Sequence, residues 1–361
     1  MRKYGGKRTL ILYLVVVLWP LIMHEIYKHH RLKFRKACSK ELHVLLAMLP
    51  MFIMIGFRSA EMGADTSTYL THFVNSINTP LEQAVANTRM ETGYIIFVKL
   101  IGAYVTKNPL IYQLICTLIY FIGVFSFAKQ QEADDAFLFI YFLGTLGLFT
   151  FMFTGVRQCI AMSICLYAYQ FAKKKELVKF LICVLIAFSF HKSALLFVVV
   201  FFVVRRKITF YNIALYGLLA YISTLYLDSI QIWFNEQLEY DYAIEETGNG
   251  GVFLIVIILL TVFSAFCIYQ QKCLNEHARA LLNVNFITIF FWILRMWTRV
   301  AERPSYYFLF FTCALVSFGL NRNVNGRPRV LFKIAIIVCT LFLYYYRMKT
   351  NFVTLIPYQF Y

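Results

Sequence analysis

Charged residues are scarce in this chain, and acidic residues are the scarcest of them. Charged side chains make up 15% of the sequence and apolar ones 60%, and the mean hydropathy is +0.66. A soluble domain is typically about 25% charged and about 45–50% apolar. The charges also gather in short clusters between long apolar runs. This pattern argues against one large aqueous globular domain and is typical of a protein that crosses a membrane many times.

The sequence also lacks the motifs of several ligand-binding classes. It contains no GxxxxGK[ST], no HExxH and no carboxylate cluster at metal-ligand spacing, so we expect neither an ATP site nor a metal ion. Its nine cysteines include no CxxC pair, which argues against a zinc site and a disulfide framework. We therefore expect no cofactor.

Positive charge is present in excess, with 35 Lys and Arg against 18 Asp and Glu. A formal net charge of +17 suggests nucleic-acid binding at first sight. The basic residues fall in short connectors between apolar runs, however, where the positive-inside rule of membrane proteins accounts for them. We therefore expect no nucleic acid among the partners.

About twelve apolar segments are candidates for membrane spans, since a span needs about 20 apolar residues. The predicted fold is an all-α, polytopic membrane protein with a single transmembrane domain over residues 1–361. Two external loops are expected, near 58–109 and 228–250. The candidate spans lie near 10–27, 42–57, 110–128, 136–153, 157–172, 178–190, 191–204, 210–227, 251–270, 281–297, 304–320 and 330–346.

The orientation follows from the basic connectors. If the spans alternate, the connectors 28–40, 173–175, 205–207 and 322–329 share one side, which we assign to the cytoplasm. The connector 228–250, with six acidic residues and no Lys or Arg, then falls outside. The basic N-terminus and the acidic linker 130–135 run against this assignment. Within the external stretch 58–109, the apolar segment 94–105 is interrupted by Lys99 and is predicted to lie in or dip into the interface.

Polar residues gather at the external ends of the predicted spans, where they are costly and so invite a functional hypothesis. Arg58, Asp65 and Tyr69 form the first group, and Asp65 and Tyr69 share a face if a helix starts there. Asp65 is also a plausible helix N-cap, and Arg58 a residue that reaches the headgroups. Glu91 stands before an apolar helix, where a carboxylate commonly complements the helix dipole.

Two further groups lie at predicted span boundaries. Arg157 and Gln158 open a span, and a helix N-terminus beside an Arg is an anion site suited to a diphosphate. His191, followed by Lys192, interrupts a long apolar stretch. It is a candidate general acid or base, or else the polar turn of a tight hairpin.

A last group, Arg295, Arg299 and Arg303, repeats at i, i+4 and i+8. On a continuous helix these residues would form a cationic stripe, and like charges at this spacing repel unless an anion neutralises them. The alternative is an ion-paired loop with aromatic-belt residues. We favour an anion site, because Arg binds phosphate in bidentate fashion and stays charged near lipid.

Six short elements, taken in order, resemble the EpsG-like family of bacterial polysaccharide membrane proteins, which belongs with the Wzy-type O-antigen and capsule polymerases. The resemblance covers nearly the whole chain. The similar elements are GFRSAEMGADTSTY (56–69), ETGY (91–94), TGVRQCIAMSI (154–164), FHKSAL (190–195), the Arg- and Tyr-rich stretch 295–307 and the terminal PYQFY (357–361).

The resemblance implies a metal-independent glycosyltransferase related to the GT-C fold, in a bacterial inner membrane with a periplasmic active face. It implies transfer of a growing glycan from undecaprenyl diphosphate to the next lipid-linked repeat unit of an O-antigen, capsule or exopolysaccharide. Membrane lipid and a chain-length-determining co-polymerase are the other expected partners. Matching motifs carry over Arg58, Asp65, Glu91, Arg157 and His191.

The expected roles follow from the chemistry of the transfer. Arginines stabilise the leaving diphosphate, and either Asp65 or His191 acts as the base for the acceptor hydroxyl, with Asp65 slightly preferred because it lies in a polar loop. An O-antigen ligase uses the same donor and is one alternative. A flippase for lipid-linked oligosaccharide is another, although polar residues near the midplane and repeated halves would then be expected.

Overall fold

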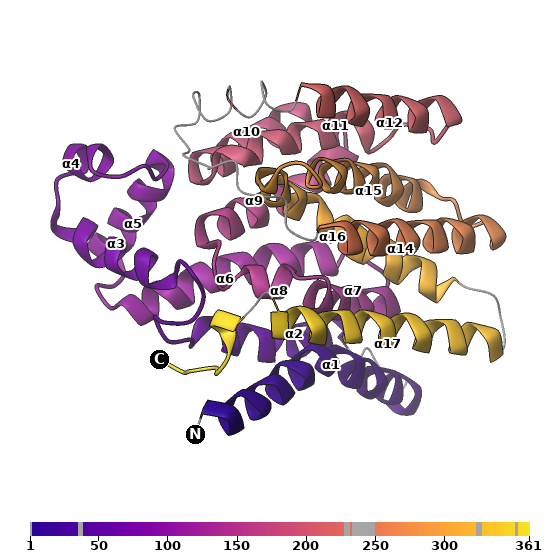
Figure 1. Cartoon of the computed structure of the whole chain (residues 1–361), viewed down its shortest axis with the longest axis horizontal. Coiled ribbons are helices and arrows are strands. Elements are labelled where there is room, and N and C mark those ends of the chain that lie inside the picture. Colours follow the sequence, from indigo (N-terminus) through magenta and orange to yellow (C-terminus); the bar gives the residue numbers. More distant parts are fainter. Residues whose placement is uncertain (1, 35–38, 227–231, 233–249, 323–326, 351–352) are drawn as a thin grey trace. The chain divides into compact units, whose positions relative to one another are not determined.

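The structure is a computed structural model. In the residues that it describes, the regular secondary structure is helical. The isolated bridge between Arg58 and Phe360 is the one pairing of β type within them. The predicted all-α class is thus confirmed for this part of the chain. The predicted external connector 228–250 lies outside it, apart from residues 232 and 250. The described residues are 2–34, 39–226, 232, 250–322, 327–350 and 353–361 (Figure 1).

The chain folds into two compact units. The first contains residues 1–167, 189–191 and 326–361, and the second contains 168–188 and 192–325. The helices of the first unit are α1 (Arg2–Phe34), α2 (Lys40–Gly56), α3 (Thr66–Asn78), α4 (Leu81–Ala86), α5 (Thr92–Tyr104), α6 (Pro109–Ala128), α7 (Ala133–Thr145), α8 (Leu148–Phe151), most of α9 (Val156–Lys173), and α17 (Arg327–Thr350) with the 3-10 turn Val353–Leu355.

The second unit is built around α16 (Glu302–Asn321), whose residues from Ser305 to Leu320 are all buried. A polar contact joins three of its helices, because Asn285 donates to Thr261 at 2.8 Å and accepts from Thr312 at 2.5 Å. The other elements are most of α10 (Leu177–Phe190), the 3-10 helix Lys192–Val198, α11 (Val199–Val203), α12 (Phe210–Leu225), α14 (Gly251–Gln270), α15 (Glu276–Leu294) and the 3-10 turn Arg299–Ala301.

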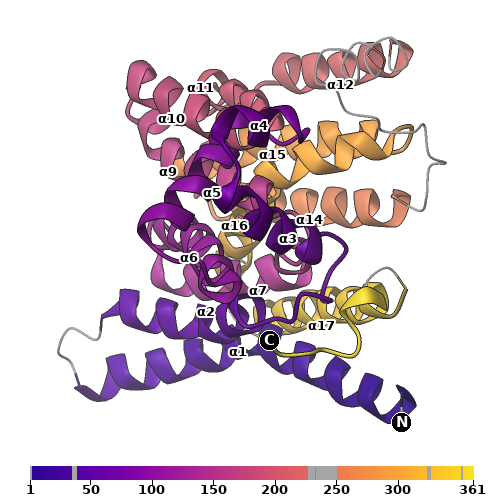
Figure 2. The ribbon, with the colours of Figure 1, turned by 90° about the vertical axis from the view of Figure 1, so that its left-hand side faces the viewer.

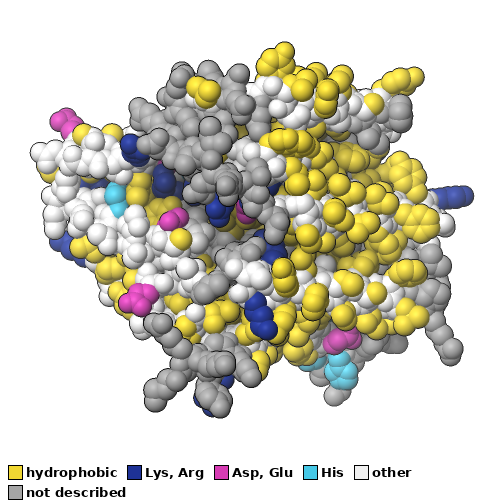
Figure 3. Space-filling view, viewed as in Figure 1, with side chains coloured by type: hydrophobic (Ala, Val, Ile, Leu, Met, Phe, Trp, Pro, Cys, Tyr) yellow, Lys and Arg dark blue, Asp and Glu magenta, His cyan; other side chains and the backbone are white. Residues whose placement is uncertain are grey.

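Several helices are long and apolar enough to cross a membrane. They are Arg8–Arg31, Pro109–Ala128, Gly251–Gln270, Glu276–Leu294 and Val330–Thr350, five within the described residues. Figure 3 shows hydrophobic side chains spread almost continuously over α14 and α15. Such a large apolar surface on a folded chain marks contact with lipid or with another protein. These observations support a multi-pass membrane protein.

On α14 the apolar surface follows the helical repeat. Val252, Ile255, Leu259, Val262 and Phe266, spaced three or four residues apart, each expose more than half of their surface. This spacing places all five on one side of the helix. The opposite side packs against α15 and α16. One side of α14 therefore serves the protein core, and the other is suited to lipid.

Within the described residues, each of the twelve apolar segments coincides with helical structure, and one of them is interrupted. The segment 136–153 divides into α7 and α8 at Gly147, whose φ of +106° ends the first helix. The break at His191, where α10 gives way to a 3-10 helix, falls where the predicted segments 178–190 and 191–204 meet. In α1 a proline stands inside the helix, and Figure 2 shows a bend near its middle. Pro20 explains the bend, because proline removes an N–H and clashes with the preceding turn.

The stretch 58–109, predicted as an external loop, is folded into short helices. Figure 1 shows α3, α4 and α5 grouped together, and α5 packs on both of the others. Lys99, which interrupts the apolar pattern of α5, donates to the carbonyls of Ser76 (3.0 Å) and Thr79. It therefore satisfies carbonyls that the end of α3 leaves without helical partners.

Candidate functional site

Glu91 is the centre of a buried ionic cluster in the first unit. It occupies the N-cap position of α5, yet its carboxylate makes no capping bond to that helix. One oxygen, Oε2, accepts from the Arg157 guanidinium, and the other, Oε1, lies 3.2 Å from Nδ1 of His191. Only 4% of the Glu91 side chain is exposed. The carboxylate thus joins two residues that stand at the starts of different elements.

Arg157, the second residue of α9, is held on two sides. It donates from Nη1 to Glu91 and from Nε to the Tyr69 hydroxyl at 3.4 Å. Its guanidinium also lies 5.9 Å from the centre of the Tyr69 ring, within cation–π range. Of the Arg157 side chain 14% is exposed, against 4–5% for Glu91 and His191, so Arg157 is the member of the cluster most open to an incoming anion.

His191 lies at the break between α10 and the 3-10 helix that follows. Because an ionised carboxylate only accepts hydrogen bonds, the Glu91 contact places a proton on Nδ1 of His191. In the neutral ring the basic lone pair then belongs to Nε2. A carboxylate that fixes the tautomer and orientation of a histidine is the arrangement by which catalytic triads prepare a general base.

Close packing of α5 against the end of α10 brings Glu91 to His191. A Cβ atom at Gly93 would lie 2.2 Å from Oγ and 2.6 Å from the backbone oxygen of Ser189. Only glycine allows this approach. The glycine of the ETGY element therefore has a structural explanation. It lets the backbone that carries Glu91 come close to Ser189, two residues before His191.

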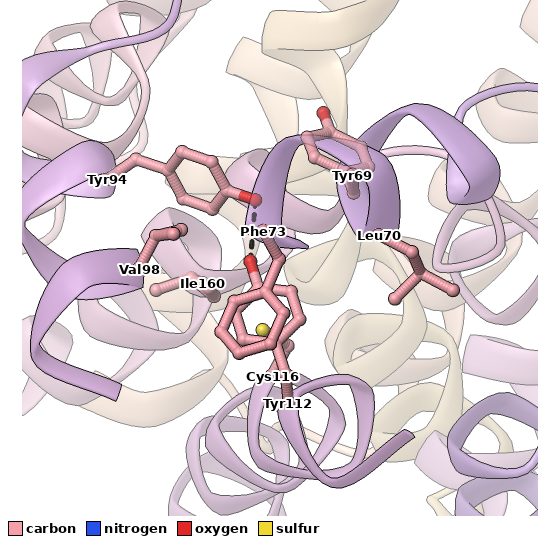
Figure 4. Packing of buried hydrophobic residues seen from close by; sticks show 8 residues of the cluster. All are labelled: Tyr69, Leu70, Phe73, Tyr94, Val98, Tyr112, Cys116 and Ile160. Atoms are coloured by element: carbon pink, nitrogen blue, oxygen red, sulfur yellow. Dashed lines mark hydrogen bonds between the residues drawn. The ribbon is translucent and has the colours of Figure 1, made fainter. Parts of the chain in front are cut away.

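An aromatic cluster includes Tyr69, the residue that contacts Arg157 (Figure 4). Tyr69 meets Tyr94 edge to face at 6.0 Å, and the Tyr94 and Tyr112 hydroxyls are 2.6 Å apart. The Tyr112 ring stacks on Phe73 at 4.2 Å. The cluster draws residues from α3, α5, α6 and α9 and fixes the helices that carry Tyr69 and Arg157.

Arg58 lies inside the fold and faces its own chain. Its side chain is 2% exposed, donates to the Ile55 carbonyl at 2.6 Å and to the Thr66 hydroxyl at 3.1 Å, and approaches the Phe153 ring. Thr66 in turn donates to the Phe153 carbonyl at 2.9 Å. A Cβ at Gly63, where φ is +84°, would lie 2.1 Å from that same oxygen. These contacts fasten the first motif to the segment that leads into Arg157.

The terminal PYQFY element is hydrogen-bonded to residues in and just before the first motif. The Ser59 N–H donates to the Gln359 carbonyl at 2.9 Å, and the Tyr361 N–H donates to the Phe57 carbonyl at 2.8 Å. The Tyr358 hydroxyl donates to the Met54 carbonyl at 2.7 Å. Four of the six elements quoted from the sequence, at 56–69, 91–94, 154–164 and 357–361, are thus linked by hydrogen bonds within the first unit, and His191 adds a residue of a fifth.

A family model matches this chain over residues 41–360, a range that includes every one of these contacts except that of Tyr361. The chain belongs to the EpsG family. That family is linked to exopolysaccharide biosynthesis. Searches of curated proteins and of solved structures found no match.

Asp65, a predicted catalytic residue, does not contact the Glu91 cluster in the described part of the structure. It occupies the N-cap position of α3, as the sequence indicates, but its carboxylate makes no capping hydrogen bond. Among the residues that the structure describes, it makes no side-chain hydrogen bond or ion pair. Its carbonyl accepts from the Tyr69 N–H at 3.1 Å, so it lies one helical turn from the cluster. Gln158, also predicted, is 3% exposed within α9.

The three remaining predicted arginines belong to the second unit. The continuous helix needed for a cationic stripe does not form, because α15 ends at Leu294 and α16 begins at Glu302. Arg295 is 6% exposed and bonds Glu302 at 2.8 Å, and Glu302 also accepts from Tyr306 at 2.8 Å. Arg299 and Arg303 are exposed. This is closer to the ion-paired loop that the sequence allows as an alternative, with one buried arginine and two on the surface.

One residue of this site was not singled out from the sequence. His72 lies one turn beyond Tyr69 on α3, with its ring 5.9 Å from that of Tyr94 and its Nε2 3.2 Å from the Ser76 hydroxyl. Burial, together with the nearby Arg157 guanidinium, lowers the pKa of His72. The sequence points to His72 only through its spacing of three residues from Tyr69, which places the two residues on one face of a helix.

Proposed function

We propose that this EpsG-family chain is a membrane polysaccharide polymerase. It transfers a growing glycan from undecaprenyl diphosphate to the next lipid-linked repeat unit, without a metal ion. The observation that carries the proposal is the bridge through Glu91, which holds a cation suited to a diphosphate and a histidine suited to proton transfer side by side. A glycosyl transfer from a diphosphate donor needs both functions.

Arg157 stabilises the leaving group in this proposal. A guanidinium carries five N–H donors, and the exposed part of the Arg157 side chain is open to a phosphate oxygen. Negative charge grows on the diphosphate as the glycosidic bond breaks, and a cation fixed beforehand stabilises that charge without reorganising. Arg58, buried and bonded to its own chain, positions the first motif, and Arg295, Arg299 and Arg303 remain candidate contacts to the lipid-linked substrate.

His191 is the base that the geometry favours. The sequence alone gives a slight preference to Asp65, but Asp65 has no contact that orients its carboxylate toward the cluster. His191 is oriented by Glu91 and would accept the acceptor hydroxyl proton at Nε2. The electron pair of that hydroxyl forms the new bond to the anomeric carbon, and the diphosphate leaves with the electrons of the old one.

The remaining proposals concern architecture and place. We propose that the twelve apolar segments all belong to the membrane part of a GT-C-related fold in a bacterial plasma membrane. The Glu91 cluster faces the extracytoplasmic side, following the basic connectors. The partners are undecaprenyl-diphosphate-linked oligosaccharide, membrane lipid and a chain-length-determining co-polymerase.

The decisive experiment measures glycan chain length in a null strain that carries variants of the gene. His191→Asn is the sharpest variant, because the asparagine amide keeps an N–H near the position of Nδ1 for Glu91 while removing the basic nitrogen. We expect normal membrane levels and loss of the polymer ladder to a single repeat unit, since general-base catalysis contributes about 10²–10⁴-fold. His29→Asn, the same change at an exposed histidine of α1, is the matched control and keeps the ladder.

Three outcomes would contradict the proposal. A full ladder from a well-expressed His191→Asn protein removes histidine as the base. A ladder in the null strain itself removes the polymerase function altogether. If even the single capped unit disappears in the null strain, the ligase or flippase alternative takes its place.

A further inference from the structure

A basic cavity of about 620 Å³ lies in the second unit, apart from every residue used above. It forms where the end of α9, the end of α11 and the start of α15 meet. Its ionisable lining consists of four basic side chains, one carboxylate and one histidine. These residues are Lys173, Lys175, Arg205, Arg279, Glu276 and His277.

The walls of the cavity are fixed by contacts that involve no ligand. Arg205 donates to the carbonyls of Ala172 and Phe201, the latter at 3.2 Å, which ties the end of α11 to the end of α9. The Asn283 amide donates to the Arg206 carbonyl at 2.7 Å, which ties the same connector to α15. A site whose walls are held beforehand loses less free energy to ordering when a ligand binds.

Two cations of the lining are not engaged in holding the walls. Among the described residues, Lys175 and Arg279 make no side-chain hydrogen bond or ion pair. Burial lowers the pKa of Lys173, with a smaller contribution from the neighbouring Lys174, and four basic side chains share the cavity. Glu276 offsets only part of this charge. A bound anion would relieve the repulsion.

We propose that this cavity binds a phosphate-bearing anion. Its volume falls in the range of small-ligand pockets, about 300–1,000 Å³, and Lys and Arg side chains recognise phosphate oxygens. The ligand is either the headgroup of an anionic phospholipid or a soluble phosphate ester, which share this chemistry. Basic pockets among membrane helices commonly hold such headgroups. The site depends neither on the Glu91 cluster nor on the polymerase proposal.

The test uses the full-length protein purified in a neutral maltoside detergent. Thermal unfolding is followed while inorganic pyrophosphate, phosphatidylglycerol or phosphatidylcholine is added. The variant is Lys175→Gln/Arg279→Gln, which removes two cations from the lining. The matched control is Arg206→Gln/Lys207→Gln, which removes two exposed cations from neighbouring positions outside it.

We expect phosphatidylglycerol or pyrophosphate to stabilise the wild type and the control, and the lining variant to bind at least about tenfold more weakly. Stabilisation by the lipid alone assigns a headgroup, and stabilisation by pyrophosphate as well assigns a soluble phosphate ester. The proposal is overturned if neither probe stabilises the wild type, if phosphatidylcholine does so equally, or if both double variants weaken binding to the same extent.

Discussion

At the scale of single residues, Glu91 connects candidates that the sequence could only name one by one. The sequence marks Glu91, Arg157 and His191 as individual candidates, each with an ordinary structural alternative. Their contacts join positions 66 and 100 residues apart, and no local pattern contains that information. The residue types were therefore predictable, whereas the ion pair that links them depends on the way α5, the start of α9 and residues 189–191 pack within the first unit.

Removal of both partners of the Glu91–Arg157 pair should cost less than the sum of the two single removals. Glu91→Gln or Arg157→Gln leaves one buried charge uncompensated, which typically costs about 3–5 kcal/mol of unfolding free energy. The double variant leaves no such charge, so its loss should be smaller than the sum of the two single losses. Unfolding in mixed micelles measures all three, and strict additivity would argue against the pair.

Polymer synthesis should be lost in all three of these variants. The recovered stability of the double variant then separates the catalytic role of the pair from a structural one. Glu82→Gln, the same substitution at an exposed carboxylate of α4, is the control and should change neither stability nor the ladder.

His72 should make the protein less stable in acid. Because its pKa is lower in the folded chain than in the unfolded one, its stabilising contribution is complete above the unfolded value of about 6.5 and is lost as the pH falls below it. Between about pH 7.5 and pH 5, the unfolding temperature of the wild type should therefore fall more than that of His72→Gln. Equal decreases in the two proteins would show that His72 does not titrate in this way.

At the scale of elements, hydropathy predicted where the helices are and the break at His191, but missed the breaks at Gly147 and after Leu294. Every apolar segment holds helical structure, because apolar runs of this length form helices to satisfy their backbone in lipid. The break at Gly147 depends on a positive φ, and the break after Leu294 separates arginines that the sequence placed on one stripe. The role of Lys99 was equally hidden, since its acceptors lie on another helix.

The contact between α5 and α10 should tolerate no side chain at Gly93. Gly93→Ala forces a methyl group against the Ser189 backbone, and overpacking of this kind costs about 1–3 kcal/mol. It should also move Glu91 from His191 and shorten the polymer. Gly217→Ala is the matched control: nothing lies within 4 Å of a Cβ there, so alanine should be neutral or stabilise α12 by up to about 1 kcal/mol. Equal unfolding temperatures for the two variants would contradict the packing argument.

At the scale of the whole molecule, the distribution of basic connectors makes a prediction about sidedness. Glu82 of the external stretch and Lys174 of a basic connector are both exposed. With Cys38, Cys273 and the exposed Cys339 replaced by Ser, a membrane-impermeant maleimide should label Glu82→Cys in intact cells and Lys174→Cys only after permeabilisation. The reverse result would place the Glu91 cluster in the cytoplasm and contradict the proposed polymerase. The basic cavity would then face outward, but its chemistry would be unchanged.

The pairing of the first motif with residues 358–361 has a consequence for biosynthesis. The Ser59 N–H and the Phe57 carbonyl lack their partners until Gln359 and Tyr361 have left the ribosome, by which time the intervening helices have already been synthesised. The loop that carries Arg58 therefore reaches its final form after translation of nearly everything between.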